Sequence, residues 1–419
     1  MRRWRLLWRG GACGRGHGHD GRVGIRAGWR QTPLKSDLQL EPDDFVVEEV
    51  LREEPGKTGD FAVYRATKRT MTTPELQAAV ARKLRVPPRA VAFPAMKDKR
   101  AVTTQHFAVH GRAPLRITGP GFEAHFVGRM THRLGPRDML GNRFTATLRG
   151  LEAGQAAGIA ARLREVAAEG LPNYFDEQRF GSYTPGGAFF GKAVLQRDAE
   201  GALRAYMAQG TSGDPPAAQA FKAAAREHWG DWNTLLRHAP RSNYRSILTF
   251  LKQHPNDFRR AVNLITPGLL PLLLAAYQSF LWNRVTSRAV EQRVAPASGP
   301  PHHVDIAGEG LVVYRGLPEA LRQELRGLTV PLPEHRAAFG DGDIAEVAAA
   351  VLAEEGLKLE DMKARLLKRA YLTRSNRPLV VVPAQVDAAI ESGGERLVAR
   401  FFLPPGSYGT LVLKAVVGR

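Results

Sequence analysis

The sequence predicts an α+β protein with a mixed, mainly antiparallel sheet and a largely helical inserted segment. Segments before residue 150 and after residue 378 are rich in valine and aromatic residues and alternate apolar with polar side chains, which is typical of strands. Residues 185–365 are rich in Ala, Leu and Arg, which favours helices. Because the strands near both ends are apolar and need partners, we expect them to share one sheet.

The first part of the chain is predicted to alternate strands with two helices. The predicted strands are residues 44–51, 61–68, 106–111 and 143–150. One helix is expected to begin with Thr73 as its N-cap and to end before Pro87, and its apolar residues repeat every four positions. Another is expected over residues 155–169, ended by Gly170. Residues 96–105 are predicted to form a loop.

The later part returns from helices to strands. Residues 264–282 form the longest apolar stretch, but interrupting Pro, Gly, Gln and Ser residues favour a buried helix that begins near Pro271 over a membrane span. Residues 295–304 are predicted to form a loop. The predicted terminal strands are residues 378–383, 396–405 and 410–417.

The charge balance indicates a polyanion partner. The chain has 419 residues, 60 Lys plus Arg and 41 Asp plus Glu, for a net charge of +19. This length suggests two or three domains, and such a basic protein usually binds nucleic acid, although a genome that encodes arginine freely gives the same composition. Residues 1–30 contain eight arginines and one acid, so they supply +7 of this charge. This tail is predicted to be disordered and to be either an RNA-binding arm or a dispensable extension.

Cysteine usage and missing motifs exclude several classes of protein. Cys13 is the single cysteine, which excludes a disulfide framework, an iron–sulfur cluster and a cysteine-based zinc site. The cytoplasm is therefore the default expectation for its compartment. The chain has no Walker A loop, no GxGxxG after a predicted strand and no HExxH. His106 and His110 lie on a predicted strand, where their spacing suits one metal badly. No metal site is therefore predicted.

The loop AMKDKRAVTTQ, residues 95–105, is the best candidate for chemistry. It places the carboxylate of Asp98 among three cations, Lys97, Lys99 and Arg100. Neighbouring positive charges favour an ionised aspartate, which is a possible nucleophile, and the same cations suit phosphates. Taken alone, the run is more typical of a solvated turn with weak surface ion pairs than of a catalytic loop.

Five segments in order resemble motifs of the TruD family of tRNA pseudouridine synthases. They are DFVVEE (44–49), AMKDKRAVTTQ (95–105), GNRF (141–144), PNYFDEQRFG (172–181) and LPPGSYGT (403–410). The family's patterns are DFxVxE, GxKDxxAxTxQ, GNxF, PNYFGxQRFG and LPxGSYAT. This chain departs from them at Ala95 and Asp176, where the family has glycine, and at Gln39, where the family places a lysine and only Lys35 lies nearby.

The resemblance implies an enzyme that isomerises uridine 13 in the D arm of tRNA without a cofactor or a metal. It implies Asp98 as the nucleophile and substrate contacts from Phe45, Asn142 and Phe144, with Phe144 as a stacking platform for a flipped base. Without it, Phe144 is simply an inward strand residue and Asn142 a turn residue. Arg179 is a candidate for a hinge or, with the cations of the 97–100 run, for an RNA contact.

The resemblance also implies the domain organisation. A pseudouridine-synthase-like catalytic domain is expected over residues 31–169 and 383–419, with a helical TRUD insertion over 170–382 and RNA in a basic cleft between them. The expected partner is tRNA, with no membrane, no protein partner and a monomer as the default state. The alternative is a non-catalytic RNA-binding protein on the same scaffold.

Overall fold

The computed structural model describes residues 42–97, 101–111, 114–211, 213–298, 301–340 and 342–418. All of these residues belong to one compact unit. Within them, no helix is both long and apolar enough to cross a membrane. The predicted tail, 1–30, lies outside the described residues.

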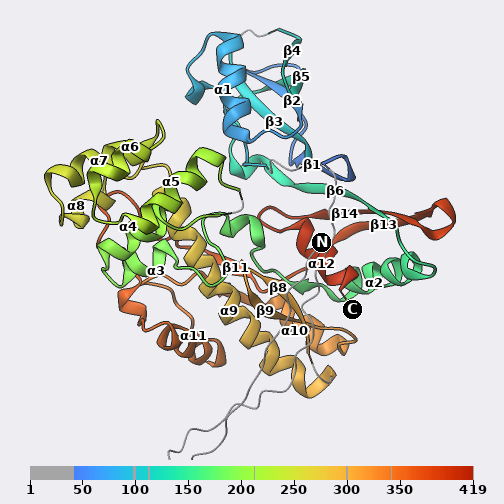
Figure 1. Cartoon of the computed structure of the whole chain (residues 1–419). Helices are drawn as coiled ribbons and strands as arrows, with labels where there is room; N and C mark the ends of the chain where they lie inside the picture. The colour runs from blue at the N-terminus through green and yellow to red at the C-terminus, as the bar shows by residue number, and fades with distance from the viewer. Residues whose placement is uncertain are drawn as a thin grey trace, which may run out of the picture. The chain divides into compact units, whose positions relative to one another are not determined.

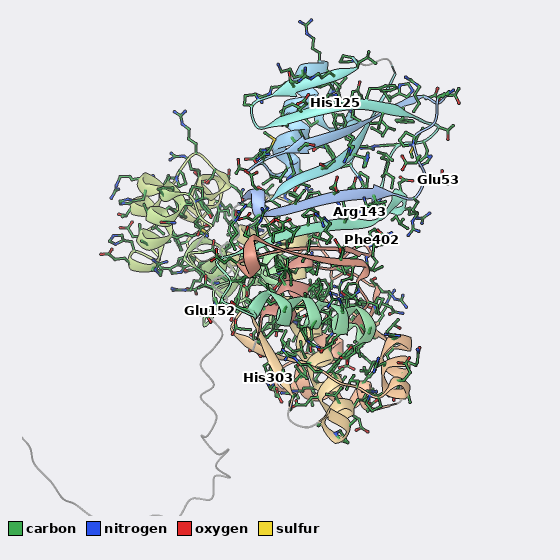
Figure 2. All side chains as sticks on the ribbon, turned by 90° about the vertical axis from the view of Figure 1, so that its right-hand side faces the viewer. Glu53, His125, Arg143, Glu152, His303 and Phe402 are labelled. Atoms are coloured by element: carbon green, nitrogen blue, oxygen red, sulfur yellow. The ribbon has the colours of Figure 1, made fainter. Side chains whose placement is uncertain are left out.

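Strands from both ends of the chain form one sheet, as predicted (Figure 1). Its order is β13-β14-β6-β1-β3-β2-β5-β4. Its strands are β1 (Phe45–Leu51), β2 (Phe61–Lys68), β3 (Val102–His110), β4 (Arg116–Gly119), β5 (Phe122–Met130), β6 (Met139–Arg149), β13 (Ala384–Glu391) and β14 (Arg396–Leu403). The β1–β3 pair is parallel and the other neighbours are antiparallel. Figure 2 shows Arg143 and Phe402 close together on β6 and β14, where the two strands pair.

Helix α1 (Thr73–Leu84) packs on the β2–β3 end of the sheet. Thr72, and not the predicted Thr73, is its N-cap: its side chain accepts a hydrogen bond from the Glu75 amide at 3.3 Å. Thr73 is the first helical residue, and its buried hydroxyl is free to bond elsewhere. Leu76 and Val80, one turn apart, are fully buried with apolar side chains of β2 and β3.

Helices α2 (Gln155–Glu169) and α12 (Gly409–Val417) pack beside the other end of the sheet and share a core with β6 and β14. The prediction of a strand over 410–417 is wrong. A short apolar run does not separate a strand from a buried helix, and α12 is buried on nearly all sides, which hides the helical period.

Two other boundaries also differ from the predictions. Strand β3 begins at Val102, because pairing with β1 and β2 extends it into the predicted loop. The predicted loop 295–304 is mostly regular, since α9 (Leu270–Ser298) continues to Ser298 and β8 (His302–Ile306) begins at His302. In segment 378–383, only short pieces outside the main sheet are strands.

The helical segment lies between α2 and β13 in the sequence. Its helices are α3 (Phe190–Leu195), α4 (Ala199–Met207), α5 (Pro216–Glu227), α6 (Trp232–His238), α7 (Asn243–Gln253), α8 (Phe258–Val262), α9, α10 (Glu319–Gly327) and α11 (Asp343–Glu354). Three strand pairs accompany them: β7 (Leu171–Pro172) with β12 (Val380–Val381), β8 with β9 (Glu309–Val313), and β10 (Thr329–Pro331) with β11 (Asn376–Pro378). The β7–β12 pair brings the two ends of this segment together, but the division into two domains stays a prediction.

Helix α9 is the central support of the helical segment. It begins at Leu270, close to the predicted start, and Trp282 is fully buried on it. Its buried polar side chains bond the backbone of other segments: Asn283 bonds the amide and the carbonyl of Phe175, and Gln278 bonds Thr373. Buried polar groups need such partners, so α9 fixes segments that are remote in sequence.

Candidate active site

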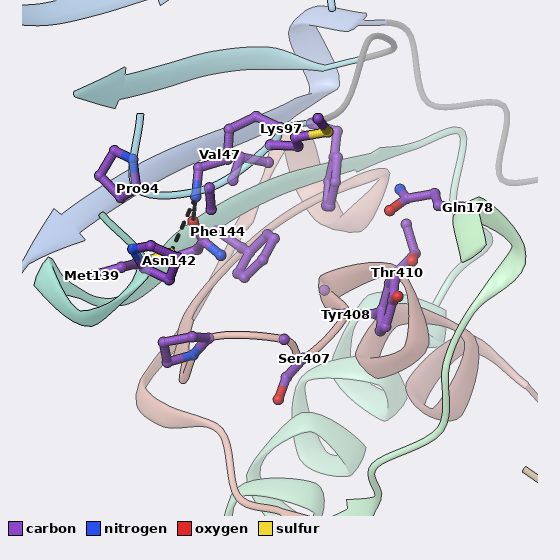
Figure 3. Close-up of a pocket in the computed structure, with 17 residues that line it drawn as sticks. Val47, Pro94, Lys97, Met139, Asn142, Phe144, Gln178, Ser407, Tyr408 and Thr410 are labelled. Carbon is purple, nitrogen blue, oxygen red and sulfur yellow. Dashed lines mark hydrogen bonds between the residues drawn. The ribbon is translucent and has the colours of Figure 1, made fainter. Parts of the chain in front are cut away.

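A pocket of about 270 Å³ opens where the first sheet strand, the loop before β3 and the segment before α12 meet (Figure 3). Its walls come from all five motif segments named above. The lining residues are Phe45, Val47, Pro94, Ala95, Met96, Lys97, Pro136, Met139, Asn142, Phe144, Gln178 and residues 405–410. Segments as far apart in the sequence as Phe45 and Thr410, 365 positions, therefore converge on one cavity.

The strand register explains this convergence. Val47 of β1 pairs with Phe144 of β6, and Phe144 pairs in turn with Phe401 of β14. Two positions along β1, Glu49 pairs with Asn142. Because side chains alternate along a strand, Phe45, Val47 and Glu49 share one buried face, and Asn142 and Phe144 share the matching face of β6.

A buried ion pair joins the lining residue Lys97 to Glu49 of β1. The Lys97 ammonium lies 2.8 Å from Oε2 of Glu49, and the two side chains are 5% and 0% exposed. The His106 amide donates to Oε1 of Glu49 at 2.8 Å. Burial alone would raise the pKa of Glu49, but the His106 side chain, whose Nδ1 lies 3.3 Å from Oε1, and the charge of Lys97 outweigh burial and lower this pKa below its usual value. Glu49 is therefore held as a carboxylate.

Lys97 also orients Asn142. Its ammonium donates to Oδ1 of Asn142 at 2.8 Å and lies 3.5 Å from Sδ of Met139 (Figure 3). A lysine can only donate, so this contact assigns the oxygen of the Asn142 amide to Lys97. The amide nitrogen of Asn142, a donor, is left for the pocket. The backbone of Lys97 is held as well, since its amide donates to Oγ1 of Thr73 at 2.9 Å.

Three phenylalanine rings form a row beside the pocket. The Phe45 and Phe144 centroids are 5.8 Å apart, and Phe144 and Phe401 are stacked at 5.4 Å with 20° between their planes. Gly409 closes this row from the α12 side, because a Cβ there would lie 2.5 Å from the Phe144 ring. A residue without a side chain is what allows this close approach.

The pocket wall on the α12 side is tied to the 172–181 motif. Asp176 is 1% exposed; its carboxylate accepts from the Thr410 hydroxyl and, at 2.7 Å, from the Lys414 ammonium. Thr410 lines the pocket, so Asp176 connects this lining residue to the entry of the helical segment. The position where the resembling family has glycine thus carries a buried anchor in this chain.

Several predicted site residues lie outside the described residues: Asp98, Lys99, Arg100, Gln39 and Lys35. The structure brings four other candidates, Phe45, Lys97, Asn142 and Phe144, to the same pocket, whereas Arg179 is not among its lining residues. The ammonium of Lys97 is buried against Glu49, which favours a positioning role over the predicted RNA contact. Among the described residues, no group of three or more His, Cys, Asp or Glu side chains is placed to hold a metal.

Comparison with known proteins gives the family. The model described as "tRNA pseudouridine synthase D (TruD)" matches residues 28–416. The chain belongs to the TruD family. The protein is therefore an isomerase that converts uridine in tRNA to pseudouridine.

Relatives and a solved structure cover nearly the whole TruD chain. It is 32% identical over 375 residues to "Probable tRNA pseudouridine synthase D" of Methanopyrus kandleri, which covers 88% of each chain. It is 26% identical to "tRNA pseudouridine synthase D" of Aquifex aeolicus, covering 90% of this chain and 97% of that protein. The crystal structure of the putative tRNA pseudouridine synthase D from Methanosarcina mazei matches with a TM-score of 0.65 at 25% identity, over 90% of this chain and 92% of that one.

Arg179 lies behind the pocket wall of this TruD protein. Its Nε donates to Oγ of Ser279 on α9 at 2.9 Å, and its guanidinium stacks 5.3 Å from the Phe175 ring. Arg377 stacks on the same ring at 4.2 Å, and burial lowers its pKa to about 10. The half-buried Arg179 is thus built into the junction with α9, beside the pocket residue Gln178.

Sequence reasoning assigned no role to Glu49, Thr73 or His106 in this site. A signal for Glu49 was present, because DFVVEEV places this acid on the same strand face as Phe45 and Val47. An acid on the apolar face of a strand indicates a buried partner. That the partner is Lys97 follows only from the parallel pairing of β1 with β3.

Proposed function

We propose that this TruD enzyme isomerises uridine 13 in the D arm of tRNA, with Asp98 as the nucleophile and the pocket as the site of the flipped base. The convergence of five motif segments on the pocket, with Lys97 in its wall and Asp98 next in sequence, supports the proposal most directly. The pocket lies near the lower end of the range of about 300–1,000 Å³ for ligand sites, which suits one nucleoside.

The reaction only exchanges bonds. The bond between C1′ and N1 breaks, the base turns and a bond between C1′ and C5 forms; C5 loses a proton and N1 gains one. Nothing is oxidised or reduced. The residues of the pocket supply a stacking surface in Phe45 and Phe144 and a donor in the Asn142 amide for a uracil carbonyl, and Asp98 is the proposed nucleophile.

Lys97 and Glu49 act on this chemistry indirectly. Glu49 neutralises the buried Lys97, and Lys97 fixes both the Asn142 amide and the start of the loop that carries Asp98. We further propose that tRNA lies in a basic cleft between the catalytic residues 31–169 and 383–419 and the insertion 170–382, and that the enzyme acts in the cytoplasm on its tRNA substrate.

The test is Asp98→Asn in the full chain, assayed on an unmodified tRNA transcript by mapping pseudouridine at each position. We expect no isomerisation at uridine 13 and unchanged affinity for the transcript. Turnover equal to that of the parent enzyme would refute the nucleophile, and pseudouridine at another position in the parent reaction would refute the substrate site.

A further inference from the structure

A second basic surface lies in the helical segment, away from the pocket residues. Residues 363–374, here called the basic strap, follow α11 and have neither helical nor strand structure. Ala364, Leu366, Leu367 and Ala370 are buried, while the cations between and after them are exposed. Those cations are Lys363, Arg365, Lys368, Arg369 and Arg374. The strap therefore presents positive charge on one side and packs on the other.

Two side-chain amides hold the basic strap in place. Asn263, at the end of α8, donates to the Leu366 carbonyl and accepts from the Lys368 amide, each at 2.9 Å. Gln278 of α9, which is 1% exposed, brackets Thr373 by donating to its carbonyl at 2.8 Å and accepting from its amide at 3.1 Å. An irregular segment with such anchors keeps its cations at fixed positions.

Helix α8 extends this positive surface. Arg259 and Arg260 of α8 line a pocket of about 530 Å³ together with Arg365 and Lys368 of the strap, and Asp257 is the single acid in its lining. Within the described residues, no carboxylate lies within 4 Å of Arg259, Arg365 or Lys368, and Arg260 pairs with Asp257 at 3.4 Å. The charge there is largely uncompensated, unlike that of Arg284 and Arg288, which pair with Glu354.

An exposed aromatic ring lies within the strap. Tyr371 is 76% exposed between Arg369 and Arg374, whereas the neighbouring apolar side chains are buried. An ordinary solvated charge run needs neither buried anchors nor an exposed ring. Cations at fixed positions beside an exposed aromatic side chain are the combination that binds phosphates and stacks on unpaired bases.

The strap is also joined to the catalytic pocket. Gln278, which holds Thr373, is followed on α9 by Ser279, which accepts from Arg179. Arg179 follows Gln178, a residue of the pocket wall. The end of the strap is thus connected to the pocket through two consecutive residues of one helix.

We propose that the basic strap and α8 bind the phosphate backbone of the tRNA substrate outside the catalytic pocket, with Tyr371 stacked on an unpaired base. This proposal rests on the proposed function only in taking tRNA as the substrate. It predicts that the enzyme reads more of the tRNA than the arm that carries the target uridine.

The test compares R365Q/K368Q/R369Q with R82Q/K83Q/R164Q, which removes three exposed cations from α1 and α2. The affinity of each variant for an unmodified tRNA transcript is measured at several KCl concentrations. For the strap variant we expect the dissociation constant to rise roughly tenfold or more, and the slope of log affinity against log salt to fall by about 3, one for each phosphate contact. The control variant should keep the parent slope.

An assay on a short RNA hairpin that contains only the D arm distinguishes effects at the strap from effects at the pocket. The strap variant should isomerise this hairpin like the parent enzyme while its KM for whole tRNA rises and its kcat stays. Tyr371→Ala should weaken whole-tRNA binding by about tenfold, and Tyr371→Phe should restore it. An unchanged salt slope in the strap variant, or equal losses on hairpin and whole tRNA, would overturn the proposal. Because binding of Asp98→Asn is measured in parallel, failure of the nucleophile assignment is seen separately.

Discussion

The catalytic pocket and the basic strap each contain a lysine, but the two lysines have opposite environments. At the pocket, Lys97 is 5% exposed and faces Glu49 and Asn142 at 2.8 Å. On the basic strap, Lys368 is exposed and its ammonium has no carboxylate within 4 Å among the described residues. A buried cation must be paired, so it fixes geometry, whereas an exposed and unpaired cation remains free to meet a phosphate.

The difference shows that the role of a run of basic residues does not follow from its sequence alone. KDKR around Asp98 and KARLLKR in the strap are both rich in lysine and arginine. The first run begins with Lys97, whose side chain is buried against Glu49 of β1. The second run lies in the exposed strap, whose backbone is held by Asn263 and Gln278. The environment decides between positioning and binding.

The largest effect is expected from removing the carboxylate that pairs with Lys97 at the pocket. Glu49→Ala leaves Lys97 buried without its partner, so we expect the free energy of unfolding to fall by about 3–5 kcal/mol, measured by urea denaturation. The strap variant R365Q/K368Q/R369Q should stay within about 0.5 kcal/mol of the parent. Similar losses in both variants would contradict the contrast.

A double variant separates charge from geometry. Glu49→Gln with Lys97→Met removes both charges, and we expect much of the lost stability to return. The rate of isomerisation should stay low, because the Asn142 amide has then lost the donor that orients it. Recovery of both stability and rate would show that Lys97 has no positioning role.

A smaller effect is expected at Gly409, on the opposite wall of the pocket. Gly409→Ala places a Cβ 2.5 Å from the Phe144 ring, which stacks on Phe401 and has little room to move. We expect the resulting overpacking to cost about 1–3 kcal/mol of stability and to raise KM, since Phe144 shifts within the pocket. Unchanged KM and stability would show that the ring adapts freely.

The smallest expected effect is on the stability of the protein at acidic pH. Burial opposes ionisation of Glu49, but His106 and Lys97 lower its pKa below the usual 4.5. The unfolded chain therefore binds this proton more readily, so the stability contributed by Glu49 is complete above pH 4.5 and is lost as the pH falls through the folded pKa. Glu49→Gln should show a weaker loss of stability over that acid range, followed by urea denaturation at each pH. An identical pH profile would contradict the low pKa.

Local patterns predicted the parts of the fold that are set by nearby residues. Valine and aromatic residues predicted the strands over 44–51 and 61–68, which are observed at 45–51 and 61–68, and an amphipathic pattern predicted the helix over 155–169. The segment 409–417 was predicted wrongly, because a helix buried on nearly all sides has no polar face to reveal its period. The five motifs predicted the family and the pocket segments, but the role of Asp98 remains a proposal.

By itself, the sequence determined the α+β class, the family and the residues that can do chemistry, since these depend on residue type, order and local periodicity. Only the tertiary structure decided that Lys97 faces Glu49, that the Asn142 amide presents its nitrogen to the pocket, and that, among the described residues, no carboxylate lies within 4 Å of the strap cations Arg365 and Lys368. Each depends on contacts between segments 45 or more residues apart in the chain. Sequence spacing does not encode such distances, because strand pairing and buried hydrogen bonds set them.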